Sequence, residues 1–178
     1  MKAQFWSFDV IFAIVIFGVA ITIIAFTWYQ ISTQLSLSYG NGAAIMELQA
    51  DTLAKSLLSE GYPSDWESLI NTTNSSTWKY VSIGILNRTG ISIKKLYAFM
   101  SMSNSNYQAT KQALGIGFDY FIVIESKLYN NGINITIGRN PAKNNALTIY
   151  VEKRSSFING VPVEINIYLW TQTPFGVE

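Results

Sequence analysis

The first pattern along the chain is an unbroken apolar run near the N-terminus. Residues 10 to 29 read VIFAIVIFGVAITIIAFTWY and contain no charged side chain. Because an α-helix rises about 1.5 Å per residue, these roughly 20 residues form a helix about 30 Å long, which matches the hydrocarbon thickness of a bilayer. The run therefore predicts a membrane-spanning helix.

The flanks of the apolar run indicate its orientation. Trp28 and Tyr29 at its end are residue types enriched at membrane interfaces, and Lys2 lies before its start. We therefore expect the N-terminus to lie in the cytoplasm and the rest of the chain to face outward. No small-residue cleavage site follows the run, so it is expected to be retained, and a plain signal anchor is the simplest interpretation.

Helical patterning continues beyond the apolar run. Uncharged polar residues with Leu and Ile extend the pattern from residue 30 to 38, and Gly40 and Gly42 then predict a kink or a break. An amphipathic helix is expected over 43–60, with an apolar stripe that would lie on a sheet. The stripe consists of Met46, Ala50, Leu53 and Leu57.

Shorter helices follow. Gly61 is expected to cap the amphipathic helix, and Ser64-Asp-Trp-Glu67 fits a capping box that opens a short helix in which Trp66 has a structural role. Two more helices are predicted over 93–102 and 108–114.

Alternation of apolar and polar residues predicts strands over 78–86, 120–125, 147–152 and 164–169. Turn signals at Asn130-Asn-Gly132 and Ile158-Asn-Gly-Val161 favour hairpins between the later strands, and hence an antiparallel sheet. The predicted fold class is α+β, with a long N-terminal helix followed by a globular domain that contains an antiparallel β-sheet and short helices.

Composition excludes several kinds of chemistry. The 178 residues include twelve basic and eleven acidic side chains, a net charge of +1, so no basic field for nucleic acid is present. The absence of Cys and His excludes disulfides, zinc sites built on these residues, Cys nucleophiles and a Ser-His-Asp triad. About 150 residues remain after the apolar run, enough for one outer domain with its own core.

One carboxylate, Asp9, stands at the start of the apolar run. An unpaired carboxylate in hydrocarbon costs several kcal/mol, so Asp9 is expected to have a partner or a task. In the simpler alternative, Asp9 lies hydrated at headgroup level and favours the helix N-terminus through the helix dipole.

The same N-terminal residues resemble a known family. Lys2-Ala3, followed by Gln4, Ser7 and Asp9 and then an unbroken apolar helix, is similar to the N-terminus of archaeal type IV pilin-like proteins. Further stretches resemble segments of archaeal pilin-like surface proteins, namely GYPSDWE at 61–67, IGIL at 83–86, LGI at 114–116 and DYF at 119–121.

This resemblance implies a leader of residues 1–3, cut between Ala3 and Gln4 by a prepilin-type peptidase. It further implies an apolar helix, 4–42, that packs in a filament core, and an outward head domain, 43–178. Asp9 would pair with the new N-terminal amine of an adjacent subunit and set the register between subunits. The implied filament-core positions are Phe5, Phe8, Phe12, Ile16 and Ile23.

Four N-glycosylation sequons occur in or beside predicted loops or turns. Their asparagines are Asn71, Asn74, Asn87 and Asn134, and none has Pro in the middle position. Attached glycans would indicate an exposed, extracellular face.

No residue set predicts catalysis, a cofactor or a metal site. Glu47 and Asp51 share a helix face, which is more simply solvated. Gly115-Ile-Gly117 precedes a strand and lacks the third glycine of a dinucleotide-binding turn. Neighbouring strands could bring two carboxylate pairs together, namely Asp119 with Glu125 and Glu152 with Glu164.

Three functions remain open at this point. The first is a structural subunit, a major or minor pilin, of an archaeal surface filament. Its partners would be copies of itself or other pilins, the peptidase and assembly machinery, and the membrane before assembly. The second is a monomeric, membrane-anchored module that binds the cell envelope or a glycan through its sheet, where aromatic side chains favour contact. The third is an anchored enzyme that uses the four strand carboxylates.

Overall fold

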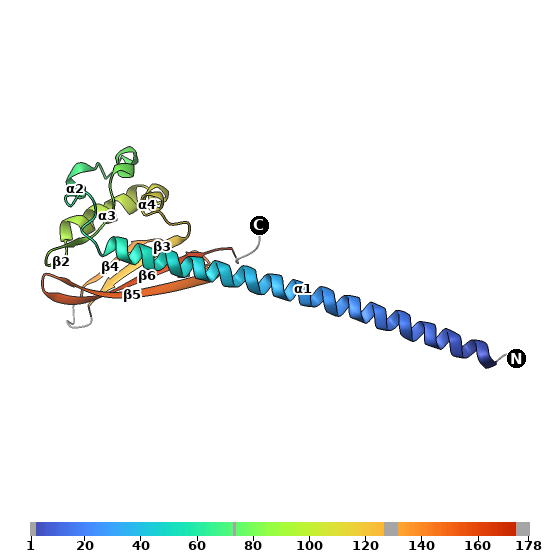
Figure 1. Ribbon diagram of the computed structural model, residues 1–178. Coiled ribbons are helices and arrows are strands. Elements are labelled where there is room, and N and C mark those ends of the chain that lie inside the picture. Colours follow the sequence, from blue (N-terminus) through green and yellow to red (C-terminus); the bar gives the residue numbers. More distant parts are fainter. Residues whose placement is uncertain (1–2, 73, 127–131, 174–178) are drawn as a thin grey trace.

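A single helix, α1 (Ala3–Leu57), extends through the first third of the chain and enters the head at its C-terminal end (Figure 1). The computed structural model describes the backbone of residues 3–72, 74–126 and 132–173, and the side chains of the same ranges except 3–8 and 34–41. At about 1.5 Å per residue, the 55 residues of α1 span roughly 80 Å.

The expected break at Gly40 and Gly42 is wrong, because α1 is continuous through both residues. A glycine inside a helix costs only about 1 kcal/mol relative to Ala, which is too little to interrupt a helix that is well formed on both sides. The amphipathic helix expected over 43–60 is therefore the last part of α1, and the expected boundary after residue 42 falls inside one helix.

The described residues of the head form five further helical segments and six strands. The helices are α2 (Trp66–Leu69), η1 (Ser75–Tyr80), α3 (Ile93–Ser105), α4 (Tyr107–Ala113) and η2 (Pro141–Lys143). The strands are β1 (Leu86–Asn87), β2 (Gly90–Ile91), β3 (Asp119–Glu125), β4 (Asn134–Gly138), β5 (Thr148–Ile158) and β6 (Val161–Thr171).

The main sheet has the order β4-β3-β6-β5 and is antiparallel throughout, which confirms the predicted α+β fold. Strands β5 and β6 form the predicted hairpin, whose turn has Asn159 at φ 50° and Gly160 at φ 79°. Two consecutive positive φ values are typical of the type I′ turn that an Asn-Gly pair favours.

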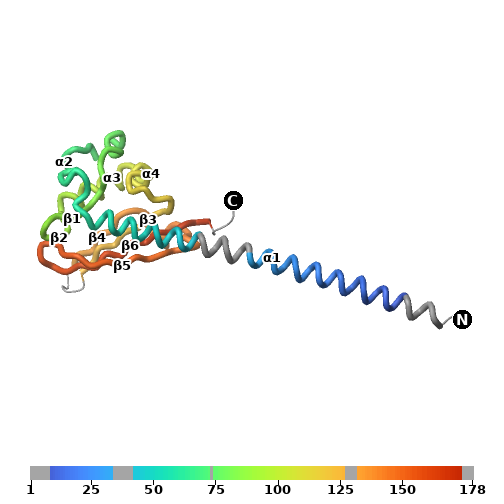
Figure 2. The backbone as a smooth tube through the Cα atoms, in the orientation of Figure 1, coloured from blue at the N-terminus to red at the C-terminus, as the bar shows by residue number. Residues whose placement is uncertain are grey.

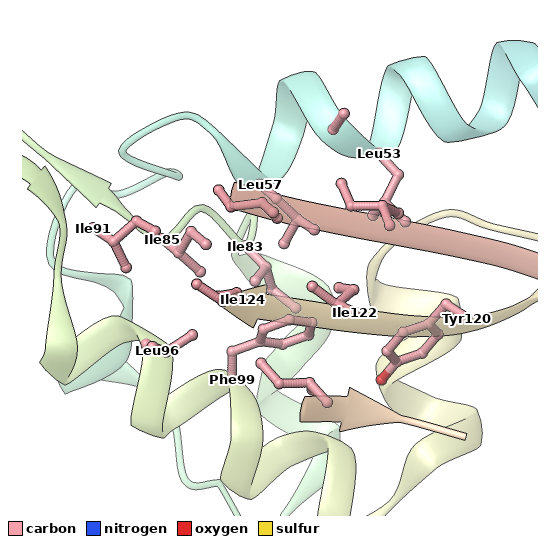
Figure 3. Packing of buried hydrophobic residues seen from close by; sticks show 14 of the residues in the cluster. Leu53, Leu57, Ile83, Ile85, Ile91, Leu96, Phe99, Tyr120, Ile122 and Ile124 are labelled. Carbon is pink, nitrogen blue, oxygen red and sulfur yellow. The ribbon is translucent and has the colours of Figure 1, made fainter. Parts of the chain in front are cut away.

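The core lies between one face of this sheet and the helices (Figure 3). The C-terminal part of α1 packs on β5 and β6, while α3 packs on β4. Leu53 and Leu57 of α1 and Phe99 of α3 approach Ile122 and Ile124 of β3 from this side, and all five are buried. The predicted stripe of α1 therefore lies on the sheet as expected.

The predicted strand over 78–86 is largely wrong. Residues 75–80 form the η1 turn, and only residues 86 and 87 belong to a strand. Backbone groups at the end of this stretch bond instead to the last residue of α1 and to the chain that follows it, with Ile85 N donating to Leu57 O (2.8 Å) and Leu86 N donating to Ser59 O (2.9 Å). These hydrogen bonds satisfy backbone N–H groups of the extended segment without the regular ladder of a β-sheet.

Two local predictions near α2 also differ from the structure. Gly61 has the left-handed φ of 74°, but α1 ends at Leu57, so Gly61 is not its immediate cap. Asp65, not Ser64, precedes α2, and its side chain makes no capping bond. Trp66 is fully buried and donates from Nε1 to Gly84 O at 2.8 Å, which confirms its structural role.

Candidate functional site

Part of α1 projects from the head (Figure 2), and its exposed side chains make it an apolar rod. Residues Asp9–Thr33 form a stretch of 25 residues that is long and apolar enough to cross a membrane, and no part of it is buried within the chain. Its apolar side chains are exposed on all sides of the helix. A helix that is apolar all round requires an apolar environment, which lipid or other helices supply.

The Ser and Thr hydroxyl groups between residues 9 and 33 are satisfied within the helix. Thr22, Thr27 and Thr33 each donate to the carbonyl oxygen four residues earlier, at 2.8 to 2.9 Å, and Ser32 donates to Trp28 O at 2.6 Å. An unbonded hydroxyl is costly in hydrocarbon, so these bonds make the rod compatible with an apolar environment.

The residues expected to form the filament core lie on this rod. Phe12, Ile16 and Ile23 are exposed by 63, 68 and 61%. Asp9 is exposed at the N-terminal end of the stretch. Ala3, Gln4, Phe5 and Phe8 lie in α1, but their side chains are outside the described residues, as is the rest of the leader.

An ion-pair cluster joins the rod's helix to the sheet. Asp51 Oδ1 accepts from Arg154 Nη2 of β5 at 2.9 Å, and Asp51 Oδ2 accepts from Lys55 Nζ at 2.6 Å. Arg154 also pairs with Glu152. The hydrogen bond from Lys55, together with the charges of Lys55 and Arg154, lowers the pKa of Asp51 below its ordinary value of 3.8. Asp51 is thus half-buried between α1 and β5. The prediction that the helix face of Glu47 and Asp51 is solvated is therefore wrong for Asp51.

A second polar contact, two residues before Asp51 in α1, holds this helix against the head. Gln49 Oε1 accepts from Gly117 N at 2.9 Å. Together with the buried stripe, these polar bonds make the C-terminal part of α1 an integral element of the head.

The outer face of the sheet, opposite the helices, exposes apolar side chains. Ile149, Val151 and Phe157 of β5 point to this face and are exposed. Phe121 and Tyr168 lie beside each other on adjacent strands, with ring centroids 5.9 Å apart. The outer sheet face is therefore a surface on which a partner would bury apolar and aromatic groups.

A buried lysine clamps three segments of the head together. Lys95 of α3 is only 4% exposed, and its Nζ donates to Glu60 O at 2.6 Å and Leu86 O at 2.9 Å. These carbonyls belong to the chain after α1 and to β1. Sequence reasoning assigned no role to Lys95, although a cation in the first turn of a helix is unfavourable for the helix dipole and signals another function.

A tyrosine pair links α4 to β3. Tyr107 and Tyr120 stack with centroids 4.9 Å apart, and Tyr107 Oη donates to Asp119 Oδ1 at 3.0 Å while it accepts from Tyr120 N at 2.9 Å. Tyr120 Oη donates to Ser103 Oγ at 2.8 Å. Burial raises the pKa of Tyr107 well above 10 and raises the pKa of Tyr120 to about 12. Both side chains are neutral structural groups at ordinary pH.

Asp119 does not pair with Glu125, and Glu152 does not pair with Glu164. Asp119 and Glu125 lie at opposite ends of β3. Glu152 lies opposite Ile167, whose side chain faces the helices, and Glu164 lies on the other face, opposite Glu125. Asp119 instead pairs with Lys111 at 3.4 Å. Among the described residues, no cluster of three acidic side chains is placed to hold a metal ion.

The four sequon asparagines are all exposed, but their local structures differ. Asn74 caps η1, with its Oδ1 accepting from Ser76 N at 3.1 Å. Asn87 ends β1, and Asn134 begins β4. Asn71 precedes η1, and the hydroxyl residue of its sequon, Thr73, is outside the described residues.

Comparison of the chain with known protein families, with curated proteins and with solved structures found no match. The α+β fold and one helix suited to crossing a membrane are therefore the basis for inferring function.

Proposed function

We propose that the chain is a structural subunit of an archaeal type IV pilus-like surface filament. In this proposal α1 is inserted in the membrane before assembly and is packed among the α1 helices of other subunits afterwards. The head faces outward, and a prepilin-type peptidase removes residues 1–3 before the assembly machinery takes up the subunit.

The observation that carries the proposal is that one unbroken helix is both the exposed apolar rod and a core element of the head. A plain anchor needs only an apolar segment and tolerates a flexible linker. A filament needs the head held rigidly relative to the packed helices, since every subunit must repeat the same geometry. The cluster of Asp51 and Arg154 and the buried stripe of α1 favour this rigid arrangement.

Packing between rods supplies the driving force in this proposal. Lipid is already apolar, so transfer from lipid to a helix bundle gains little from the hydrophobic effect, and close van der Waals packing must contribute instead. Asp9 would be matched by the amine that the cut exposes at Gln4. The pairing removes the cost of an isolated carboxylate in an apolar core and fixes the axial register of neighbouring helices.

Two measurements test the proposal together. Electron microscopy of material sheared from cells that express the chain, labelled with an antibody to the head, should show labelled filaments. Mass spectrometry of the same material should give a chain that begins at Gln4. An intact chain found only in detergent-solubilised membranes, as monomers, would contradict the proposal.

The second candidate function is a monomeric, membrane-anchored module that binds the cell envelope or a glycan. The outer sheet face favours it, because Ile149, Val151 and Phe157 are exposed there and no described element covers them. This candidate predicts that Phe157→Ser and Val151→Ser reduce binding of detergent-solubilised full-length chain to isolated envelope. In the filament proposal Asp9→Ala reduces filament yield, whereas in this second candidate the chain forms no filament and Asp9 has no pairing role.

A further inference from the structure

A polar pocket opens on the head between α2, the β1–β2 turn and the start of α3. Its volume is about 430 Å³, within the range of about 300–1,000 Å³ that is typical of small-molecule sites. Besides two serines, its lining consists of Glu60, Glu67, Asn87, Arg88, Thr89 and Lys95. All are polar, so the pocket suits a hydroxyl-rich ligand better than an apolar one.

One wall of the pocket is a sequon asparagine with a fixed conformation. Asn87 Oδ1 accepts from Thr89 N at 2.9 Å and from Thr89 Oγ1 at 3.0 Å, which forms an Asx turn. Neither bond uses Asn87 Nδ2, the atom to which an N-linked sugar is attached. Asn87 is exposed, and among the described residues that line the pocket it is the one sequon asparagine.

Glu67, which lines the pocket, has one buried carboxylate oxygen: its Oε2 has no hydrogen-bond partner among the described residues. Lys95, by contrast, already donates to two carbonyl oxygens. The Glu67 side chain lines the pocket and its carboxylate oxygens accept hydrogen bonds, so a ligand that donates them, such as a sugar hydroxyl, complements this side chain.

We propose that Asn87 carries an N-linked glycan and that its first sugar lies in this pocket. In the modification, Nδ2 attacks the anomeric carbon of a lipid-phosphate-linked oligosaccharide. The bond from that carbon to the phosphate oxygen breaks, the phosphate leaves with the electron pair, and Nδ2 loses one proton. Once attached, the sugar is held at a high effective concentration, so a pocket of weak intrinsic affinity suffices.

The other sequons lack this combination. Asn74 Oδ1 likewise accepts from the backbone N of the third residue of its sequon, Ser76, but Asn74 does not line this pocket, and Asn134 lies within β4 opposite Glu125. The inference concerns Asn87 and rests on the proposed function in one respect, the outward placement of the head. It does not depend on filament formation.

Glycopeptide mass spectrometry of the full chain, produced in a host that glycosylates surface proteins on asparagine, tests the modification. Wild type and Thr89→Ser, which keeps the sequon, should carry a glycan on Asn87, and Thr89→Ala should lose it. An unmodified Asn87 in wild type overturns the inference. Protease accessibility of the head on intact cells, measured in parallel, shows whether the outward placement has failed as well.

Hydrogen–deuterium exchange tests the position of the sugar. Amides of residues 60–67 and 92–95 should exchange severalfold more slowly in the glycosylated Thr89→Ser chain than in Thr89→Ala, and Glu67→Ala should abolish the difference without changing occupancy at Asn87. Equal exchange in the two Thr89 variants, with Asn87 glycosylated in Thr89→Ser, would overturn the placement in the pocket.

Discussion

Asp51 of α1 and Arg154 of β5 form a salt bridge of 2.9 Å across the junction between the long helix and the sheet. The two residues are 103 positions apart in the chain, so the bridge exists only when the head is folded around α1. Removing Arg154 leaves Asp51 with Lys55 alone, on its own helix.

We predict that Arg154→Ala lowers the melting temperature of the detergent-solubilised chain by a few degrees, with the fold retained. The pKa of Asp51 is lowered in the folded state, so its contribution to stability is present above its ordinary pKa of 3.8 and is lost as the pH falls below that value. The difference between wild type and Asp51→Asn should therefore be constant near neutral pH and shrink below pH 3.8. A difference that grows on acidification would contradict this. Lys153→Ala, on the outer face, is the control.

Removal of the buried lysine should be strongly destabilising. Lys95→Met keeps most of the side-chain volume but leaves the carbonyls of Glu60 and Leu86 without their donor. Because each unsatisfied buried group costs about 1–3 kcal/mol, we expect a loss of about 3 kcal/mol in the free energy of unfolding. Denaturant unfolding measures it. Lys94→Met, at the exposed neighbouring position, should change the free energy by less than about 0.5 kcal/mol.

A methyl group at Gly84 should not be tolerated. A Cβ there would overlap the backbone atoms Gly61 N and Ser59 O, where two chain segments cross. We expect Gly84→Ala to destabilise the head by about 3 kcal/mol or more, because backbone atoms cannot move aside as a flexible side chain can. Gly117→Ala is the matched control, since its Cβ would have its nearest contact at 3.7 Å, to Gln49. Equal unfolding midpoints for the two variants would refute the argument.

The tyrosine pair predicts loss of stability at alkaline pH. The pKa values of Tyr107 and Tyr120 are raised in the folded state, so their neutral forms favour folding, and this contribution is complete below pH 10 and is lost as the pH rises above it. The free energy of unfolding should fall between pH 10 and 12 in wild type and fall less in Tyr120→Phe. Absorbance titration near 295 nm should show two tyrosines that ionise after the others.

Asp9 predicts an effect on assembly and not on folding. If Asp9 pairs with a neighbour's N-terminal amine, Asp9→Ala should leave the head folded but reduce filament yield about tenfold or more. A loss of about 1.4 kcal/mol per subunit contact lowers the association constant tenfold. Quantified electron microscopy of sheared filaments measures the yield. Asp9→Glu should retain most of it, and Glu47→Gln, exposed on the same helix, should retain all of it. Undiminished yield in Asp9→Ala would favour hydration at headgroup level.

The parts of the fold that the sequence predicted well are those with a strong regular period. Tyr120, Ile122 and Ile124 alternate with more exposed neighbours along β3, and Asn159-Gly160 forms the predicted turn. Alternation did not reveal which face of β5 meets α1. There the apolar Ile149 and Val151 face outward, and the charged Arg154 faces α1, because Asp51 supplies its partner.

The errors have a common physical cause in long-range contacts. The alternating stretch before β1 has the pattern of a strand, but its backbone donors bond to acceptors at the end of α1 and in the loop after it. Lys95 likewise gains its role from carbonyls 35 and 9 residues away. Neither partner is encoded in a local pattern, so the pocket beside Asn87 was not predictable although the sequon was.

The continuity of α1 has a mechanical consequence. A pull on the head is transmitted through Leu53, Leu57 and the Asp51–Arg154 bridge directly into the helical rod, with no hinge to absorb it. Torque follows the same route, so a rotation of the rod about its axis turns the head by the same angle. Tension is therefore resisted by the hydrophobic core itself, and the head is expected to unfold under load before it swivels.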